Sequence, residues 1–201
     1  GVGKTSLARR LATSFGSDLV LEQGEDNPFL ERFYRNPRAA AFQTQLYFLF
    51  QRARQMQELR QHDLFQRVRV ADYLLEKDRL FGRLTLDDEE FALYEQVYSR
   101  LAIDAPVPDL VVYLQAPIDT LLERIARRGI HYEQQIERRY LERLAEAYAR
   151  FFLEFDAAPV LIVNAADIDP VGSETDYASL LAEIVRARKG RHYFNPMKSL
   201  L

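Results

Sequence analysis

Short apolar runs alternate with longer helical stretches along this chain. The runs cover residues 18–22, 67–73, 109–117 and 159–165. Helices are predicted over residues 27–34, 37–61, 74–82, 86–103, 133–155 and 173–187, with one more at the start of the chain and one ending near Arg128. Strands separated by helices predict βαβ units, in which helices cover both faces of a mainly parallel sheet. The pattern therefore predicts a three-layer α/β/α fold with four strands in this sequence.

The first six residues, GVGKTS, match the end of a phosphate-binding loop. Gly3, Lys4 and Thr5 fit the last three positions of the pattern G-x-x-x-x-G-K-[ST], and a helix follows. We expect the first glycine of the pattern, and a strand before it, to lie upstream of Gly1. Backbone N–H groups at a helix N-terminus attract phosphate, and the lysine and the hydroxyl would reach the β/γ-phosphates and magnesium. An ordinary glycine-rich turn with a solvated lysine is the alternative.

Composition limits the class of protein. The length of 201 residues suits a single domain, and 48% hydrophobic residues are enough for a sizeable core. The net charge of −3 does not favour bulk nucleic-acid binding. Cysteine is absent, which excludes disulfides and thiolate metal sites and fits a cytoplasmic protein. No apolar run reaches the length of about 20 residues that spans a bilayer, so no membrane association is expected.

Two carboxylates end predicted strands, where ligands of parallel sheets bind. Glu22 ends the first run and could accept a proton from a hydroxyl that attacks a γ-phosphate. Asp72 ends the second run, where an acid commonly supports magnesium. The alternative for Glu22 is a solvated side chain, and for Asp72 it is the N-cap of the next helix.

Three arginines gather at a predicted helix end and turn, before Gly129. Arg124, Arg127 and Arg128 could close over transferring phosphates and neutralise charge in the transition state. The alternative is that they only complement the C-terminal end of the helix dipole.

Five stretches of the sequence, taken in order, resemble the deoxynucleoside kinases, most of all the bacterial deoxyadenosine and deoxyguanosine kinases. The stretches are GVGKTS, LEQGEDNPFLERFYRNP, FQT, DYLLEKDRLF and RRGIHYEQQIERRYLERL, and they span nearly the whole chain. The resemblance implies a P-loop NTPase-like domain over residues 1–201, with five strands in the family and a lid at about 124–134. It also implies transfer of the γ-phosphate of ATP to the 5′-hydroxyl of a deoxynucleoside, with Mg²⁺.

The resemblance assigns roles to individual residues. Glu22 matches the general base, and Tyr34 and Glu133 match residues that hold the sugar 3′-hydroxyl. Gln43 matches a glutamine that bonds the nucleobase, and Asp78 matches an acid beside that base. The donor site would consist of Gly1, Gly3, Lys4, Thr5, Ser6 and Arg127, with Arg124 and Arg128 in catalysis and with Thr5 and Asp72 at the metal. Without the resemblance, Tyr34 would be interpreted as core packing and Gln43 as a satisfied helix amide.

Three positions depart from the family pattern. Tyr73 stands where many members have an arginine after the acid, and Ile130 stands where a lid arginine is common. Phe50 stands where an arginine often pairs with the acid that Asp78 matches. These departures leave the preferred base open.

Two other functions compete with a nucleoside kinase. A nucleoside monophosphate kinase would share the loop and the lid, but Glu22, Tyr34 and Gln43 favour an uncharged acceptor. A regulatory subunit with little catalysis fits the departures at Tyr73 and Ile130. A GTPase is disfavoured because the sequence has no N-K-x-D motif.

The helices at 37–61 and 86–103 carry many apolar side chains. They are Phe42, Leu46, Leu49, Phe50, Phe91, Tyr94, Val97, Tyr98 and Leu101. One face of a sheet covers only part of this area, and a leftover aromatic patch commonly marks a partner surface. We therefore expect a homodimer, as the resemblance also implies. The alternative is that these side chains pack on one another.

Overall fold

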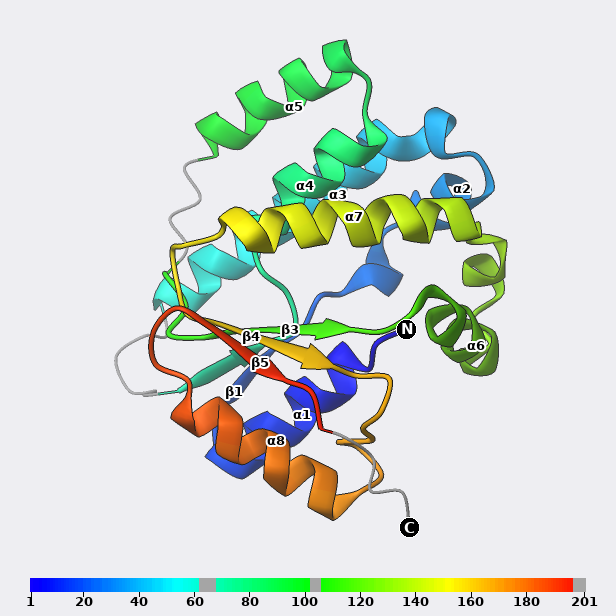
Figure 1. The fold of residues 1–201 in the computed structure, drawn as a ribbon. Coiled ribbons are helices and arrows are strands. Elements are labelled where there is room, and N and C mark those ends of the chain that lie inside the picture. Colours follow the sequence, from blue (N-terminus) through cyan, green and yellow to red (C-terminus); the bar gives the residue numbers. More distant parts are fainter. Residues whose placement is uncertain (62–67, 102–105, 197–201) are drawn as a thin grey trace.

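The computed structural model describes residues 1–61, 68–101 and 106–196. The strands form the middle layer between two groups of helices (Figure 1). One group is α1 (Lys4–Phe15) with α8 (Glu174–Arg186), and the other contains α3 (Pro37–Gln61), α4 (Lys77–Thr85) and α7 (Arg138–Glu154). The predicted three-layer α/β/α arrangement is confirmed.

Every described strand pair is parallel, as predicted. β1 (Asp18–Val20) pairs with β2 (Arg69–Ala71), with Leu19 opposite Val70. β3 (Val111–Gln115) pairs with β4 (Val160–Asn164), which pairs with β5 (Arg191–Phe194). The described strands form two sheets rather than one, and residues of β2 and β3 line a common cavity of about 3080 Å³. The strand that we expect ahead of the phosphate loop stays a prediction.

The core lies on both faces of β4. Val160, Leu161 and Val163 have no exposed surface. Leu161 and Val163 pack on one face with α1 and α8 residues such as Leu11 and Leu180. Val160 packs on the other face with aromatic side chains of α7. A strand that is buried on both faces reads as a continuous apolar run, which explains why the sequence predicts β4 clearly.

The remaining described elements are three α-helices that largely follow the predictions, with shifted ends, and two short 3-10 helices that were not predicted. They are η1 (Gly24–Asp26), α2 (Leu30–Arg35), α5 (Asp88–Arg100), α6 (Ile118–Arg128) and η2 (His131–Gln135). The helix predicted from 133 begins as α7 at Arg138, because Ile136 and Glu137 have extended backbones. The helix predicted over 74–82 is observed as α4, which begins three residues later. Residues 67 and 102–105, at the ends of two predicted elements, lie outside the described part.

The strand β5 was not predicted. Its four residues, Arg191–Phe194, alternate between exposed and partly buried positions at an edge of the sheet. So short an edge strand has too few apolar residues to give a clear periodic signal. None of the described helices is long and apolar enough to cross a membrane.

Candidate active site

The phosphate-binding loop runs directly into α1. Gly3 has a φ of +87°, a left-handed conformation that favours glycine, and Lys4 is the first residue of the helix. The backbone N–H groups of the first turn have no partner within the helix, so this end favours an anion. The predicted loop geometry is therefore present at residues 3–6.

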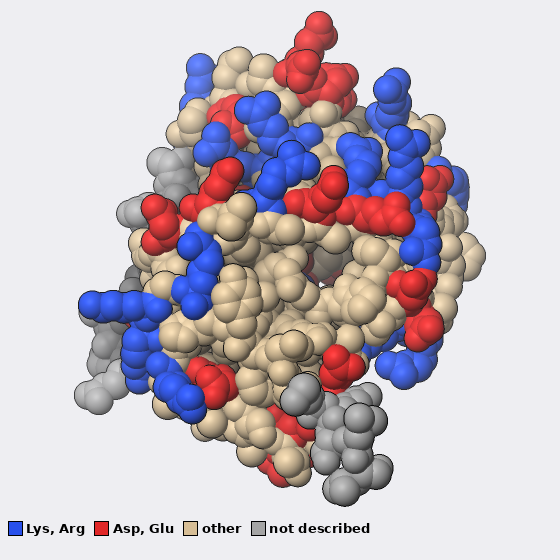
Figure 2. Space-filling model, in the orientation of Figure 1, with Lys and Arg blue, Asp and Glu red and all other residues tan. Residues whose placement is uncertain are grey.

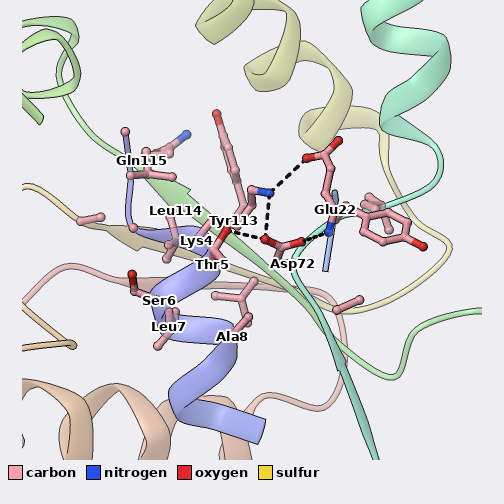
Figure 3. Close-up of a pocket in the computed structure, with 18 of the residues that line it drawn as sticks. Lys4, Thr5, Ser6, Leu7, Ala8, Glu22, Asp72, Tyr113, Leu114 and Gln115 are labelled. Atoms are coloured by element: carbon pink, nitrogen blue, oxygen red, sulfur yellow. Dashed lines mark hydrogen bonds and ion pairs between the residues drawn. The ribbon is translucent and has the colours of Figure 1, made fainter. Parts of the chain in front are cut away.

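Thr5 and Asp72 meet beside this helix end (Figure 3). The Thr5 hydroxyl donates to Asp72 Oδ2 at 2.5 Å, and the backbone N–H of Glu22 donates to Asp72 Oδ1 at 2.7 Å. Asp72 is 3% exposed and follows β2 directly. The pairing of β1 with β2 brings Glu22 and Asp72 to the same edge of the sheet. Asp72 does not cap α4, whose N-cap is Glu76, so the capping alternative is wrong.

Glu22 is surrounded by three cations. Lys4 Nζ lies 3.3 Å and Lys77 Nζ 2.8 Å from Glu22 Oε2, and Arg52 pairs with Glu22 Oε1. Figure 3 shows Lys4 between Glu22 and Asp72, whose Oδ2 is 3.5 Å from Lys4 Nζ. Burial opposes the charged form of Glu22, but the three cations outweigh it and hold its pKa well below the usual range. Glu22 is therefore an ionised carboxylate at neutral pH.

Arg52 links Glu22 to Asp78. Its two terminal nitrogens pair with Glu22 and with Asp78 Oδ1. Asp78 is 2% exposed and Arg52 3%. Asp78 Oδ2 and Arg52 Nε are buried without a hydrogen-bond partner among the described residues. Buried polar atoms without a partner are costly unless a ligand pairs with them.

Tyr34 and Glu133 come from different elements and both line the cavity. Tyr34 comes from α2, and its ring stacks on Tyr132 of η2 at a centroid distance of 5.9 Å. Burial raises the pKa of the Tyr34 hydroxyl, with smaller contributions from Tyr140 and the nearby Glu133. The structure therefore brings these two predicted residues close together.

The three arginines of α6 also line the cavity, beside Gly1 and the loop. Arg124 donates to the Ala165 carbonyl at 2.8 Å, and Arg128 Nε donates to Glu133 Oε2 at 2.9 Å. Arg127 and Arg128 also occupy the last turn of α6, as the dipole interpretation requires. Figure 2 shows basic and acidic side chains mixed on the viewed face, with a hollow near its centre.

Comparison with known proteins now identifies the family. The family model for deoxynucleoside kinases matches residues 1–187. This chain belongs to the deoxynucleoside kinase family. It is 34% identical to deoxyguanosine kinase of Bacillus subtilis (strain 168) over 189 residues, which cover 92% of this chain and 91% of that protein. It is 28% identical to the deoxyadenosine/deoxycytidine kinase of the same organism, over 92% of this chain and 87% of that protein.

Solved structures share the fold of this kinase. The structure of deoxyadenosine kinase from M. mycoides with bound dATP superposes with a TM-score of 0.77 at 24% identity, covering 92% of this chain and 94% of that one. The structure of the same enzyme with bound dCTP gives a TM-score of 0.72 at 23% identity, covering 92% and 95%. The predicted P-loop kinase fold is thereby confirmed.

The structure adds to the interpretation of two positions on α3, Phe50 and Gln43. Phe50 stands where the family often has an arginine that pairs with this acid, but here Arg52 pairs with Asp78 and Phe50 is 50% exposed. Gln43 is exposed on α3, whereas Gln45 is 4% exposed and donates to Thr85 Oγ1 at 3.3 Å. Gln43 therefore lies apart from the buried Arg52–Asp78 pair.

A helix-phase argument explains this difference and could have revealed it. Gln45 and Arg52 are seven residues apart, which is close to two full turns, so they share one face of α3. Gln43 and Arg52 are nine residues apart, which is about two and a half turns and places them on opposite faces. The motif FQT therefore draws attention to a glutamine that faces away from the Arg52–Asp78 pair.

Tyr73, another of the three departures from the family pattern, has a defined structural role. Its hydroxyl donates to Gln55 Oε1 at 2.9 Å, and its ring lies 5.4 Å from the Arg52 guanidinium carbon. Gln55 in turn donates to the Leu21 carbonyl at 3.0 Å, next to Glu22. Tyr73 therefore supports Arg52 and the end of β1. Sequence reasoning also missed Lys77, whose Nζ contacts Glu22.

Proposed function

We propose that this kinase transfers the γ-phosphate of ATP, or another nucleoside triphosphate, to the 5′-hydroxyl of a purine deoxynucleoside in nucleotide salvage. The main support is one contact. The carboxylate of Glu22 lies 3.3 Å from the amine of Lys4, the lysine of the phosphate loop. The attacking hydroxyl must lie beside both the γ-phosphate and the base that takes its proton. A carboxylate next to the lysine that binds the γ-phosphate is in a suitable position for that base.

The residues support a single displacement step. The 5′-hydroxyl oxygen forms a bond to the γ-phosphorus, and the bond from that phosphorus to the bridging oxygen breaks. The electron pair leaves with the nucleoside diphosphate, and the hydroxyl proton passes to Glu22. Lys4 and the first-turn N–H groups of α1 hold the donor phosphates. We assign the donor site to Gly1, Gly3, Lys4, Thr5 and Ser6.

Thr5 and Asp72 would hold magnesium. Their oxygens are 2.5 Å apart at the helix end, and hydroxyl, carboxylate and phosphate oxygens are suitable magnesium ligands. Among the described residues no group of three or more His, Cys, Asp and Glu could hold a metal ion alone. This fits an ion that is bound mainly through the nucleotide, which would neutralise phosphate charge.

We assign recognition of the nucleobase to Gln45, Arg52 and Asp78, with Gln45 in place of Gln43. A planar amide can both donate to and accept from one edge of a base. Asp78 Oδ2 and Arg52 Nε add an unpaired acceptor and an unpaired donor. Purine edges with an amino group offer a matching donor, whereas thymine offers fewer such contacts. The names of the bacterial relatives, deoxyguanosine and deoxyadenosine kinases, support the same substrate class.

The sugar and the lid complete the acceptor and donor sites. Tyr34 and Glu133 would hold the 3′-hydroxyl and orient the 5′ end for in-line attack. Arg124, Arg127 and Arg128 of the lid would neutralise charge on the transferring group. Arg128 is paired with Glu133 in the structure, so this pair would have to rearrange around both substrates.

We also propose a homodimer. Most of the apolar set on α3 and α5 packs internally, with Leu49, Phe91 and Tyr94 forming a buried cluster. The interpretation as internal packing therefore holds for these residues. Phe50 and Leu93 remain 50% and 49% exposed on the same two helices and are candidate contacts with a second chain. A cytoplasmic location stays a prediction.

A phosphorylation assay with the four deoxynucleosides tests the proposal, with ATP and magnesium. We expect deoxyadenosine or deoxyguanosine to exceed thymidine by about tenfold or more in kcat/KM, since unpaired buried polar groups penalise the wrong base. A clear preference for thymidine would refute the assigned substrate class. Activity on nucleoside monophosphates alone would instead support the monophosphate kinase alternative, which the family match does not favour.

A further inference from the structure

Two lysines share one oxygen of Glu22. Lys4 Nζ lies 3.3 Å from Oε2, and Lys77 Nζ donates to the same oxygen at 2.8 Å. Arg52 holds the other oxygen, Oε1. The carboxylate therefore has more cationic partners than its single charge requires, and its Oε2 has no free place for a substrate hydroxyl while both lysines are bound.

The two lysines are held very differently. The side chain of Lys4 is 42% exposed at the start of α1, whereas that of Lys77 is 10% exposed in the first turn of α4. The Lys77 ammonium also lies 5.8 Å from the centre of the Phe81 ring. Lys4 can thus turn towards a ligand in the cavity, while Lys77 is fixed by the packing around it.

Binding of donor phosphates would separate the two lysines. Phosphate oxygens at the N-terminus of α1 compete with Glu22 for Lys4, the exposed lysine of the loop. When Lys4 turns to the phosphates, one side of Glu22 Oε2 is vacated and faces the loop. Lys77 and Arg52 still hold the carboxylate on its other sides.

We infer that Lys77 is the positioning residue for Glu22: its ammonium keeps the ionised carboxylate aimed at the acceptor hydroxyl after the donor has drawn Lys4 away. This inference rests on the proposed function and deepens it. Lys77 acts through Glu22 and does not itself take the proton.

A purely structural role explains the arrangement less well. Glu22 already has Arg52 and Lys4 as counter-ions, and burying a further ammonium costs stability that an apolar side chain would not cost. Burial lowers the pKa of Lys77 to about 8, although Glu22 opposes this shift and Arg52 and Lys4 add to it. A buried cation that is retained at such a cost fits a function better than a packing role.

The test compares Lys77→Met and Lys77→Arg with Lys189→Met, an exposed lysine outside the site. We expect Lys77→Met to lower kcat by about tenfold or more while KM for the nucleoside changes by less than about threefold. Lys77→Arg should keep most of the activity, and Lys189→Met all of it. A kcat of Lys77→Met within about twofold of wild type would overturn the inference.

The pH profile separates positioning from packing. Because the pKa of Lys77 is about 8 in the free protein, wild-type kcat/KM should fall as the pH rises through that value and the lysine loses its charge. The alkaline fall should disappear in Lys77→Arg, since arginine stays charged. An alkaline fall that is unchanged in Lys77→Arg contradicts the inference.

A measurement that does not depend on turnover keeps the inference testable if the proposed function fails or Lys77→Met does not fold. The chain has four lysines, so ¹³C-lysine NMR gives few signals to assign. In the free protein Lys77 should titrate near pH 8, and magnesium and ATP should shift the Lys4 signal more than the Lys77 signal, because Lys77 keeps its contact with Glu22. A Lys77 signal that titrates near the ordinary value of about 10.4, or that moves together with Lys4, refutes the inference. Inactivity of wild type on every deoxynucleoside would refute only the proposed function.

Discussion

Lys4 and Arg52 pair with the same carboxylate, yet the Lys4 side chain is 42% exposed and that of Arg52 only 4%. In the proposed mechanism, the donor side of the site contains Lys4, Thr5 and Asp72. Arg52 belongs to the acceptor side, with Gln45 and Asp78. The donor side keeps an exposed cation ready for a charged ligand, whereas the acceptor side is buried and ordered before any ligand binds.

This difference follows from what each side must recognise. A triphosphate carries its own charge and can displace Lys4 from Glu22. A nucleobase is neutral, so it is selected by polar groups that are already desolvated and in place. Glu22 contacts both cations, so this one carboxylate connects the donor side with the acceptor side.

The largest expected effect distinguishes the two sides by stability. Arg52→Met removes a buried cation from between Glu22 and Asp78, which should destabilise the protein by about 3–5 kcal/mol because the buried carboxylate of Asp78 loses its ion-pair partner. Lys4→Met removes the same charge from the same carboxylate, but this pair is partly exposed, so a change of about 1 kcal/mol or less is expected. Urea unfolding of both variants measures the difference.

Equal losses of stability in Arg52→Met and Lys4→Met would break the comparison. Equal losses would mean that the exposure of the Lys4 and Arg52 side chains does not determine how much each ion pair with Glu22 contributes to stability. The activity of Lys4→Met should nevertheless be lost, because in the proposed mechanism Lys4 holds the donor phosphates. This combination of near-normal stability and lost activity is specific to the donor side.

The next effect concerns Glu22 itself. Glu22→Gln should lower kcat by about 10² or more, which is typical for loss of a general base. Nucleoside binding, measured by calorimetry, should survive because Arg52 and Asp78 remain. Glu89→Gln, an exposed change outside the site, is the control. Near-normal turnover of Glu22→Gln would remove Glu22 from the role of base.

The pH dependence of stability provides a second measurement on Glu22. The pKa of Glu22 is lower in the folded protein than in the unfolded chain, because three cations outweigh the effect of its burial. Its contribution is therefore present above the unfolded pKa of about 4.3 and is lost as the pH falls through the folded value. The stability difference between wild type and Glu22→Gln should accordingly shrink on acidification below about pH 4.

The sequence predicts the donor side better than the acceptor side, for a physical reason. The phosphate loop is contiguous, and Glu22 and Asp72 follow neighbouring parallel strands, whose ends meet at one edge of the sheet. The pairing of Arg52 with Asp78 depends on how α3 and α4 are rotated against each other. Local sequence does not determine that rotation, so the sequence draws attention to Phe50 and Gln43, whereas the structure pairs Arg52 with Asp78 and buries Gln45.

The same limit applies to elements that depend on tertiary packing. The long helix α3 has the bounds predicted for it, Pro37–Gln61, because a proline starts it and a continuous helical pattern follows. In contrast, the apolar residues of α3 and α5 mostly bury one another, and Tyr94 has no exposed surface. A change at Tyr94 would therefore test the core of one chain and not an interface.

A smaller effect separates the two glutamines on the acceptor side. Gln45→Ala should raise KM for the preferred deoxynucleoside by about tenfold, since a base edge loses its amide partner. Gln43→Ala is the matched control on the exposed face of the same helix and should leave KM unchanged. Steady-state kinetics at saturating ATP measure both. An increase in KM for Gln43→Ala alone would restore Gln43 as the residue that contacts the base.

The smallest expected effect concerns the outer surface of α3. Phe50 is 50% exposed on this helix, two positions before the buried Arg52. If Phe50 contacts a second chain, Phe50→Glu should give a monomer by placing like charges near the two-fold axis. KM for the nucleoside should rise by no more than about threefold, because the buried acceptor side is ordered within one chain. Light scattering at micromolar concentration measures assembly, with Phe50→Tyr as a control that should remain a dimer. A wild-type monomer would refute the dimer, whereas a monomeric Phe50→Glu with a much higher KM would show that the second chain helps to order the acceptor side.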